Sequence, residues 1–251
     1  VLRLISLCSD GDHELGAVVD LVSRDQSLAG HVLSVANSVA YSPLVAVASI
    51  SEAVKRLGAR TIVDLCISMV VREQVFRSRG QRSELLLGLW KRASLAGVFS
   101  QRIGQLRRGP HELALLVGLL HDIGEPILVR MVEELERDFG RKLPLEDLQG
   151  FLGPLHQDVG GMVIRRWGLP EELELAALHH HDSVALSSSA ESAALAQLAD
   201  TLASWTLEPE SRGEQRLAEL PAVAELGLDP ARLGGLFADR ERIREIAAAQ
   251  A

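Results

Sequence analysis

Helix start and stop signals recur along almost the whole chain and leave little room for other secondary structure. Residues 49–52 read Ser-Ile-Ser-Glu, the pattern of a capping box, in which serine and glutamate side chains bond to the first backbone amides of a helix. Residues 57–58 read Leu-Gly, and glycine tolerates the backbone conformation that follows a helix. Pro110, Pro144 and Pro170 each suit the first turn of a helix. The signals predict a chain built from successive helices.

Composition favours the same fold class. Aromatic residues make up only 4% of the chain, so Leu, Val, Ile and Ala must fill the core, and this mix favours helices over strands. The one strand-like segment, 44–48, is predicted to be an extended connection. We therefore expect an all-α, multi-helix bundle. The expected helices span residues 13–24, 27–37, 49–57, 59–77, 84–105, 110–123, 126–138, 144–152, 155–167, 170–180, 189–205 and, more loosely, 221 to the end.

Charge and apolar patterning exclude several classes of function. The net charge of −8 and the pI near 5.5 argue against nucleic-acid binding, which needs clustered Lys and Arg. No apolar run approaches the roughly 20 residues that span a bilayer, and the first residues lack the pattern of a signal peptide. Cys8 and Cys66 lie in apolar helical segments and are predicted to be small buried residues in a reducing compartment. We expect a cytoplasmic protein without a membrane contact.

A His-Asp pair stands at the end of an apolar helical segment. His121 and Asp122 are costly to bury unless they are paired or bound to a metal. Further histidines and an aspartate follow on the apolar stripes of later predicted helices, so the spacing predicts one shared polar site in the bundle. The candidate metal ligands are His121, Asp122, His156, His179, His180 and Asp200. Two alternatives stay open: single histidines hydrogen-bonded in the core, and solvated histidines at the helix end for His179 and His181.

The chain resembles a known superfamily in these residues. The His-Asp pair, the later histidines and the final aspartate resemble the HD superfamily of metal-dependent phosphohydrolases. Residues 25–38, 50–58, 89–90, 160–161 and 167–170 are similar to its HDOD branch. This resemblance implies a bacterial signal-transduction domain without demonstrated hydrolase activity. It also implies a single unit, 1–251, in which an HD-like helical core (84–206) follows an N-terminal helical subdomain (1–83) and precedes a C-terminal helical extension (207–251).

Two residues depart from the pattern of an active member. Arg92 stands where the family carries its first metal-binding histidine, and a guanidinium offers only donors and cannot ligate a metal. One hypothesis is that Arg92 replaces the metal by bonding to Asp122 or Asp200; the alternative is that it extends from the helix edge to solvent. Glu125 stands where the cyclic-di-GMP phosphodiesterase branch usually has lysine, and its Gly-Tyr-Pro loop is replaced by residues 181–184. Loss of catalysis is therefore predicted.

The expected function is that of a non-catalytic regulatory domain acting through protein–protein or ligand binding. The alternative is a metal-dependent phosphohydrolase (phosphodiesterase), and a third reading is a nucleotide-sensing pocket without turnover. No cofactor is expected under the first reading, whereas Fe, Mn or Zn would serve the second. The expected partners are proteins of a signalling pathway, with a nucleotide as candidate ligand. The Leu-rich segment 233–246 suggests a homodimer.

Overall fold

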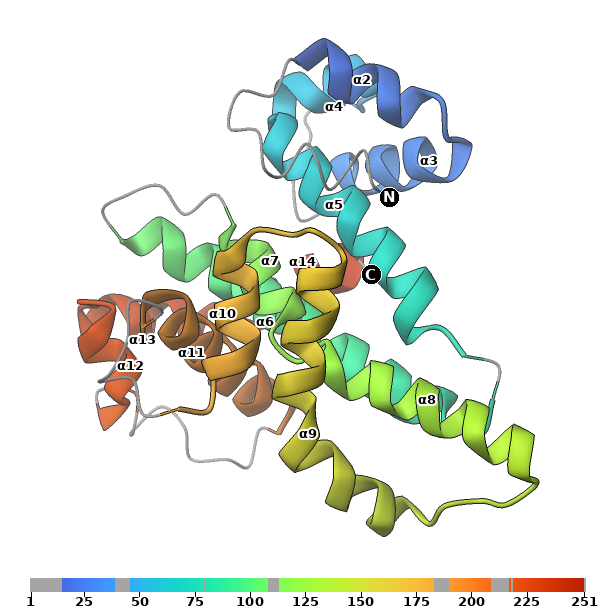
Figure 1. Cartoon of the computed structure of the whole chain (residues 1–251). Helices are drawn as coiled ribbons and strands as arrows, with labels where there is room; N and C mark the ends of the chain where they lie inside the picture. Colours follow the sequence, from blue (N-terminus) through green and yellow to red (C-terminus); the bar gives the residue numbers. More distant parts are fainter. Residues whose placement is uncertain are drawn as a thin grey trace.

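The computed structural model describes residues 15–38, 46–78, 80–107, 113–182, 190–208, 217 and 219–250. All regular secondary structure in these ranges is helical, and no strand occurs among them (Figure 1). The predicted all-α fold is confirmed. Within the same ranges no helix is both long and apolar enough to cross a membrane.

The first helices form a lobe at one end of the molecule (Figure 1). They are α2 (Leu15–Ser23), α3 (Gln26–Ala36), α4 (Ile50–Leu57) and α5 (Ala59–Val71). The predicted capping box of α4 is present, because Glu52 N donates to Ser49 Oγ at 3.2 Å and Ala48 N donates to Glu52 Oε2 at 3.1 Å. The predicted cap of α3, Ser27, is wrong: the carboxylate of Asp25 accepts from the second and third amides instead.

The described part of the expected extended connection, residues 46–48, is held by one side chain. Val47 N donates to Asn37 Oδ1 at 2.7 Å, and Asn37 Nδ2 donates to Val47 O at 2.9 Å. Both backbone polar groups of the buried Val47 are thereby satisfied without a strand partner. Residues 44 and 45 lie outside the described residues, as does Cys8, while Cys66 is buried as predicted.

The helix expected at 59–77 changes its pitch before it ends. After α5 the chain forms a π-helical turn, η2 (Arg72–Phe76), so the expected single α-helix is wrong over its last residues. The side chains of this turn pack on α6. The rings of Phe76 and Trp90 meet edge to face at 5.1 Å, and the guanidinium of Arg72 lies 5.9 Å from the centre of the Trp90 ring. This packing accounts for the wider turn, which re-aims its side chains toward α6.

The remaining helices build the larger part of the molecule around α6 (Figure 1). α7 and α11 pack along α6, α8 packs on α9, α10 lies between α9 and α11, and α14 returns onto α6. The loosely predicted C-terminal helix is three helices. The bounds are α6 (Ser83–Leu106), α7 (Ala114–Leu120), α8 (Gly124–Phe139), α9 (Leu145–Arg166), α10 (Glu171–His179), α11 (Ala190–Leu207), α12 (Pro221–Glu225), α13 (Pro230–Ala238) and α14 (Arg240–Gln250).

One helix, α9, replaces the two that were expected at 144–152 and 155–167. Pro154 lies inside it and cannot donate to the carbonyl of Gly150. Both residues are exposed, so water can satisfy that carbonyl, and the helix continues. The predicted break at Pro154 is therefore wrong, because proline at a solvent-facing position disturbs only one hydrogen bond.

Two glycines set how closely the helices of the site approach each other. A Cβ added at Gly118 would lie 2.2 Å from the carbonyl oxygen of Ala96, and one at Gly124 would lie 1.9 Å from that of His156. No side chain can occupy either position without moving backbone. The His-Asp turn between α7 and α8 is consequently held directly against α6 and α9.

Candidate functional site

Six polar side chains from different elements meet where α6, α7, α9, α10 and α11 come together. His121 and Asp122 lie in the turn between α7 and α8, where the apolar α7 ends. The others come from α6, α9, α11 and the end of α10: Arg92, His156, Asp200 and His180. The histidines at 121, 156 and 180 are buried to 4% exposure or less. The predicted convergence of residues that lie far apart in the sequence is thus present.

The three buried histidines are oriented in the same way. His121 Nδ1 lies 2.8 Å from the carbonyl oxygen of Gly118. His156 Nδ1 lies 2.8 Å from the oxygen of Gly153, and His180 Nδ1 lies 3.0 Å from that of Ala177. A carbonyl only accepts, so each Nδ1 carries the proton and donates it. This arrangement directs each Nε2 into the site and is typical of histidines that ligate metals.

The first group of converging atoms is rich in histidine. His180 Nε2 lies 2.9 Å and His156 Nε2 3.5 Å from Oδ1 of Asp122. The two Nε2 atoms lie 3.3 Å from each other. Because each Nδ1 faces a backbone carbonyl, the two Nε2 atoms are directed toward each other and toward Asp122, an arrangement that can hold a metal ion. His181 completes the group, whose ligand atoms all lie within 4.8 Å of one another.

The second group shares Asp122 but contains a fixed cation. His121 Nε2 lies 3.2 Å from Asp122 Oδ2 and 3.5 Å from Asp200 Oδ1. Arg92 binds the same carboxylate of Asp200 through two bonds, Nε to Oδ1 at 2.6 Å and Nη2 to Oδ2 at 2.7 Å. It also lies 3.7 Å from Asp122 Oδ2. The head group of Arg92 therefore points into the site rather than into solvent, as the substitution hypothesis requires.

The charges of the second group balance without a metal. Burial opposes the charge of His121, but Asp122 and then Asp200 outweigh it and raise the pKa of this imidazole well above its usual value. Burial opposes the charge of Asp200 as well, but hydrogen bonds from His121 and Arg92 lower its pKa to about 2. Burial also opposes the charge of Arg92, but the hydrogen bonds to Asp200 and the charge of Asp200 outweigh burial and raise the pKa of the guanidinium. Two cations thus face two carboxylates, of which Asp122 also contacts the histidines of the first group.

Glu125 adds a carboxyl at the edge of this network. It lies at the start of α8, three residues after Asp122. Burial and the charge of Asp122 raise the pKa of Glu125, although Arg92 opposes them. The predicted effect of Glu125 on a phosphodiester stays a prediction.

The sequence selected one wrong histidine at the end of α10. His179 was a candidate ligand, but its Nδ1 lies 2.7 Å from Oδ2 of Asp182, away from the converging atoms. His181 enters the site instead, with its ring centre 5.0 Å from that of His156. The physical reason is that α10 ends here: the amide of His180 still bonds to the carbonyl of Ala176, whereas His181 follows in a turn where the helical stripe no longer applies. The run of three histidines at 179–181 was the only sequence signal for His181.

These residues form two groups that could hold a metal ion, namely Asp122, His156, His180 and His181, and His121, Asp122 and Asp200. Three imidazoles and a carboxylate are a donor set that suits Zn, Fe or Mn. Two imidazole nitrogens bound to one zinc at about 2.0–2.1 Å in tetrahedral geometry lie about 3.3–3.4 Å apart. The distance between the Nε2 atoms of His156 and His180 fits that geometry. In the second group, the Arg92 guanidinium already binds the carboxylate of Asp200.

The sequence matches a known family over most of its length. The profile of the HDOD domain family matches residues 1–183. An uncharacterized protein of Treponema pallidum is 27% identical over 190 residues, which cover 72% of this chain and 36% of that protein. The chain therefore spans about a third of the length of this curated relative.

Solved structures share the fold. An HDOD domain protein of unknown function from Geobacter sulfurreducens aligns with a TM-score of 0.75 and 23% identity over 100% of this chain and 91% of the other. A proposed phosphohydrolase from Shewanella amazonensis aligns with a TM-score of 0.75 and 21% identity, over 100% of this chain and 92% of the other. A proposed signal transduction protein from Marinobacter aquaeolei aligns with a TM-score of 0.73 and 22% identity, over 99% of this chain and 58% of the other.

Proposed function

The chain belongs to the HDOD domain family, and we propose that it is a non-catalytic regulatory domain of bacterial signal transduction, acting in the cytoplasm through protein or ligand binding. Structural relatives described as signal-transduction proteins and as phosphohydrolases share the fold, so the fold alone does not separate the two functions. The site residues support the regulatory reading. Its partners would be signalling proteins or a second copy of this chain.

The observation that carries the proposal is the pair of hydrogen bonds that the Arg92 guanidinium donates to the carboxylate of Asp200. A divalent ion in the second group would need the carboxylate that this guanidinium already neutralises, and it would be repelled by the fixed positive charge. It would also have to displace the proton of His121, whose pKa is raised well above its usual value. Arg92 thus favours a site without a metal at this position.

The first group remains suited to a metal. His156, His180, His181 and Asp122 would hold it, and a bound ion would supply Lewis-acid activation of water. The alternative function, a metal-dependent phosphohydrolase, draws its support from this group and from the inward-facing Nε2 atoms. Against it, Arg92 fills the neighbouring position, and Glu125 stands where the phosphodiesterase branch of the superfamily usually has lysine.

Turnover of a simple phosphodiester tests the proposal. Purified protein supplied with Mn²⁺, Fe²⁺ or Zn²⁺ is incubated with bis(p-nitrophenyl) phosphate, and Asp122→Ala is the matched control. We expect the same rate for both proteins, equal to that of the metal alone. Metal-dependent turnover that Asp122→Ala abolishes would refute the regulatory proposal and support the hydrolase.

A further inference from the structure

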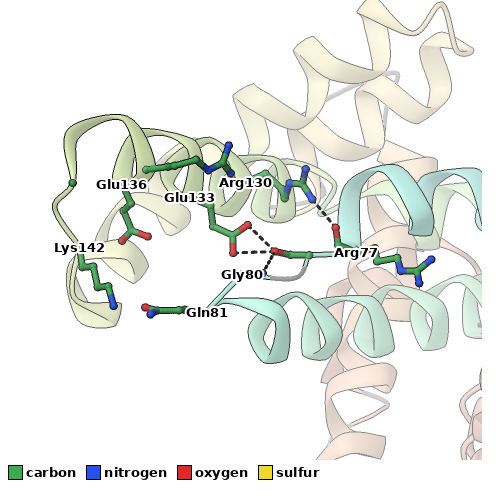
Figure 2. Close-up of a pocket in the computed structure, with 10 residues that line it drawn as sticks. Arg77, Gly80, Gln81, Arg130, Glu133, Glu136 and Lys142 are labelled. Atoms are coloured by element: carbon green, nitrogen blue, oxygen red, sulfur yellow. Dashed lines mark hydrogen bonds between the residues drawn. The ribbon is translucent and has the colours of Figure 1, made fainter.

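A pocket separate from the histidine cluster lies between α8 and the segment that joins η2 to α6 (Figure 2). Its volume is about 670 Å³, within the range of about 300–1,000 Å³ for sites of small ligands. It shares no residue with the candidate metal groups. The described lining comprises Arg77, Ser78, Gly80, Gln81, Arg130, Glu133, Glu136, Arg137, Gly140 and Lys142.

The lining carries more positive than negative charge, although the chain as a whole is acidic. Four cationic side chains face two carboxylates, and both carboxylates are already bonded. Glu136 accepts from Arg82 at 2.5 Å and from the amide of Leu143 at 2.7 Å. Glu133 accepts from the hydroxyl of Ser78 at 3.0 Å. Arg82 therefore neutralises Glu136, whereas Glu133 keeps its charge and the cations of the lining still outnumber it.

Two of the cations form neither an ion pair nor a side-chain hydrogen bond among the described residues. Arg77 pairs with Glu73, and Arg130 donates to the carbonyl of Arg77. In the part of the chain that the structure describes, neither Arg137 nor Lys142 forms an ion pair. Figure 2 shows Lys142 pointing toward Gln81 across one side of the pocket. These two cations are thus available to a bound anion.

The pocket is built from closely packed elements. A Cβ added at Gly80 would lie 2.5 Å from Glu133 Oε1, so the joining segment lies close to the end of the Glu133 side chain of α8. The start of α6 contributes partial positive charge and the end of α8 partial negative charge, and these dipoles oppose each other. The side chains therefore set the charge of the pocket.

We propose that this pocket binds a small molecule that carries two or more phosphate groups. Guanidinium groups bind phosphate oxygens in pairs, and several cations spaced around one cavity match an anion of several charges. The volume of the pocket is that of a site for a small molecule. The site lies at the other end of α8 from Asp122, so a ligand there would act on the helix that begins at the histidine cluster. This inference does not depend on whether the cluster is catalytic.

Calorimetric titration with inorganic pyrophosphate and with ADP tests the proposal. The double variant Arg137→Gln/Lys142→Gln removes the two cations that form neither an ion pair nor a side-chain hydrogen bond among the described residues. The control Lys55→Gln/Arg166→Gln makes the same chemical change at two exposed residues outside the pocket. We expect the control to bind each probe with the same dissociation constant as the natural chain. The pocket variant should bind each probe at least tenfold more weakly. Circular dichroism checks that all three proteins fold.

Four outcomes would overturn the proposal. They are no binding of either probe by the folded natural chain, equal binding by the pocket variant, tighter binding of citrate than of pyrophosphate, and binding of an oligoglutamate peptide without binding of pyrophosphate. Phosphodiester turnover is a separate measurement, so failure here leaves the proposed loss of catalysis unaffected, and the reverse also holds.

Discussion

At the scale of single residues, Arg92 and His121 together supply the positive charge that Asp122 and Asp200 require. A metal ion exchanges with solvent, but a guanidinium is covalently part of the chain and stays protonated at every physiological pH. The network around Asp200 therefore has one charge state over the neutral range. Such a constant site is suited to a structural or regulatory role.

Asp64 on α5 makes stability depend on pH. Burial raises its pKa to about 7, even though Arg60 opposes this with an ion pair at 3.0 Å. Between about pH 4 and pH 7 the unfolded chain releases the proton that the folded chain keeps. The free energy of unfolding therefore falls as pH rises through this window, by about 3–4 kcal/mol in total from this group.

Urea denaturation of the natural chain and of Asp64→Asn between pH 4 and pH 8 measures this dependence. The neutral amide cannot titrate, so the stability of Asp64→Asn relative to the natural chain should increase steadily with pH and level off above pH 7. Parallel pH profiles for the two proteins would contradict the assignment.

The sequence identified most of the site at the residue scale. His121, Asp122, His156, His180 and Asp200 are predictable because each falls on an apolar stripe that runs along a helix or continues into the turn at its end. His181 was not predictable in this way, because it follows the end of α10, where helical periodicity no longer applies. The direction of Arg92 depends on the packing of α6 against α11, so both alternatives remained open until the packing was known.

At the scale of elements, α8 and α9 touch through a glycine. A Cβ at position 124 would lie 1.9 Å from the carbonyl oxygen of His156 and 2.8 Å from the amide of Gly160. Both contacts are with backbone, so the two helices must separate to accommodate a methyl group. The same contact positions His156 next to Asp122.

Gly124→Ala should therefore lower the free energy of unfolding by at least about 2 kcal/mol. The matched control is Gly150→Ala on the exposed face of α9, where nothing lies within 4 Å of the new Cβ. That substitution should stabilise the chain by about 0.5–1 kcal/mol through helix propensity. Equal effects of the two substitutions in urea denaturation would show that the close approach of α8 to α9 is not as described.

Helix boundaries were predictable where a local signal decides them and not where packing does. The capping box of α4 is local, so its residues predict it. The π-helical turn at 72–76 depends on the contacts of Phe76 and Arg72 with Trp90, which no local pattern reveals. The continuity of α9 through Pro154 depends on which face of the helix meets solvent.

At the scale of the whole molecule, the family and the all-α fold follow from several motifs in their correct order. The division into residues 1–83, 84–206 and 207–251 stays a prediction. α14 packs on α6 and also contacts α3 and α5, which ties the C-terminal residues to both other parts. The described lining of the cationic pocket comes from residues 77–78 and 80–81 and from residues 130–142, so the pocket exists only after folding and no sequence motif indicated it.

The central claim is that Arg92 takes the place of a metal ion in the second group. Native mass spectrometry after saturation with Mn²⁺ counts the ions in the natural chain, in Arg92→His and in the control Arg102→His, which makes the same change elsewhere on α6. We predict at most one Mn²⁺ ion in the natural chain and in the control, held by the first group. Arg92→His should bind one ion more than the natural chain. Two ions in the natural chain, or none gained by Arg92→His, would contradict the claim.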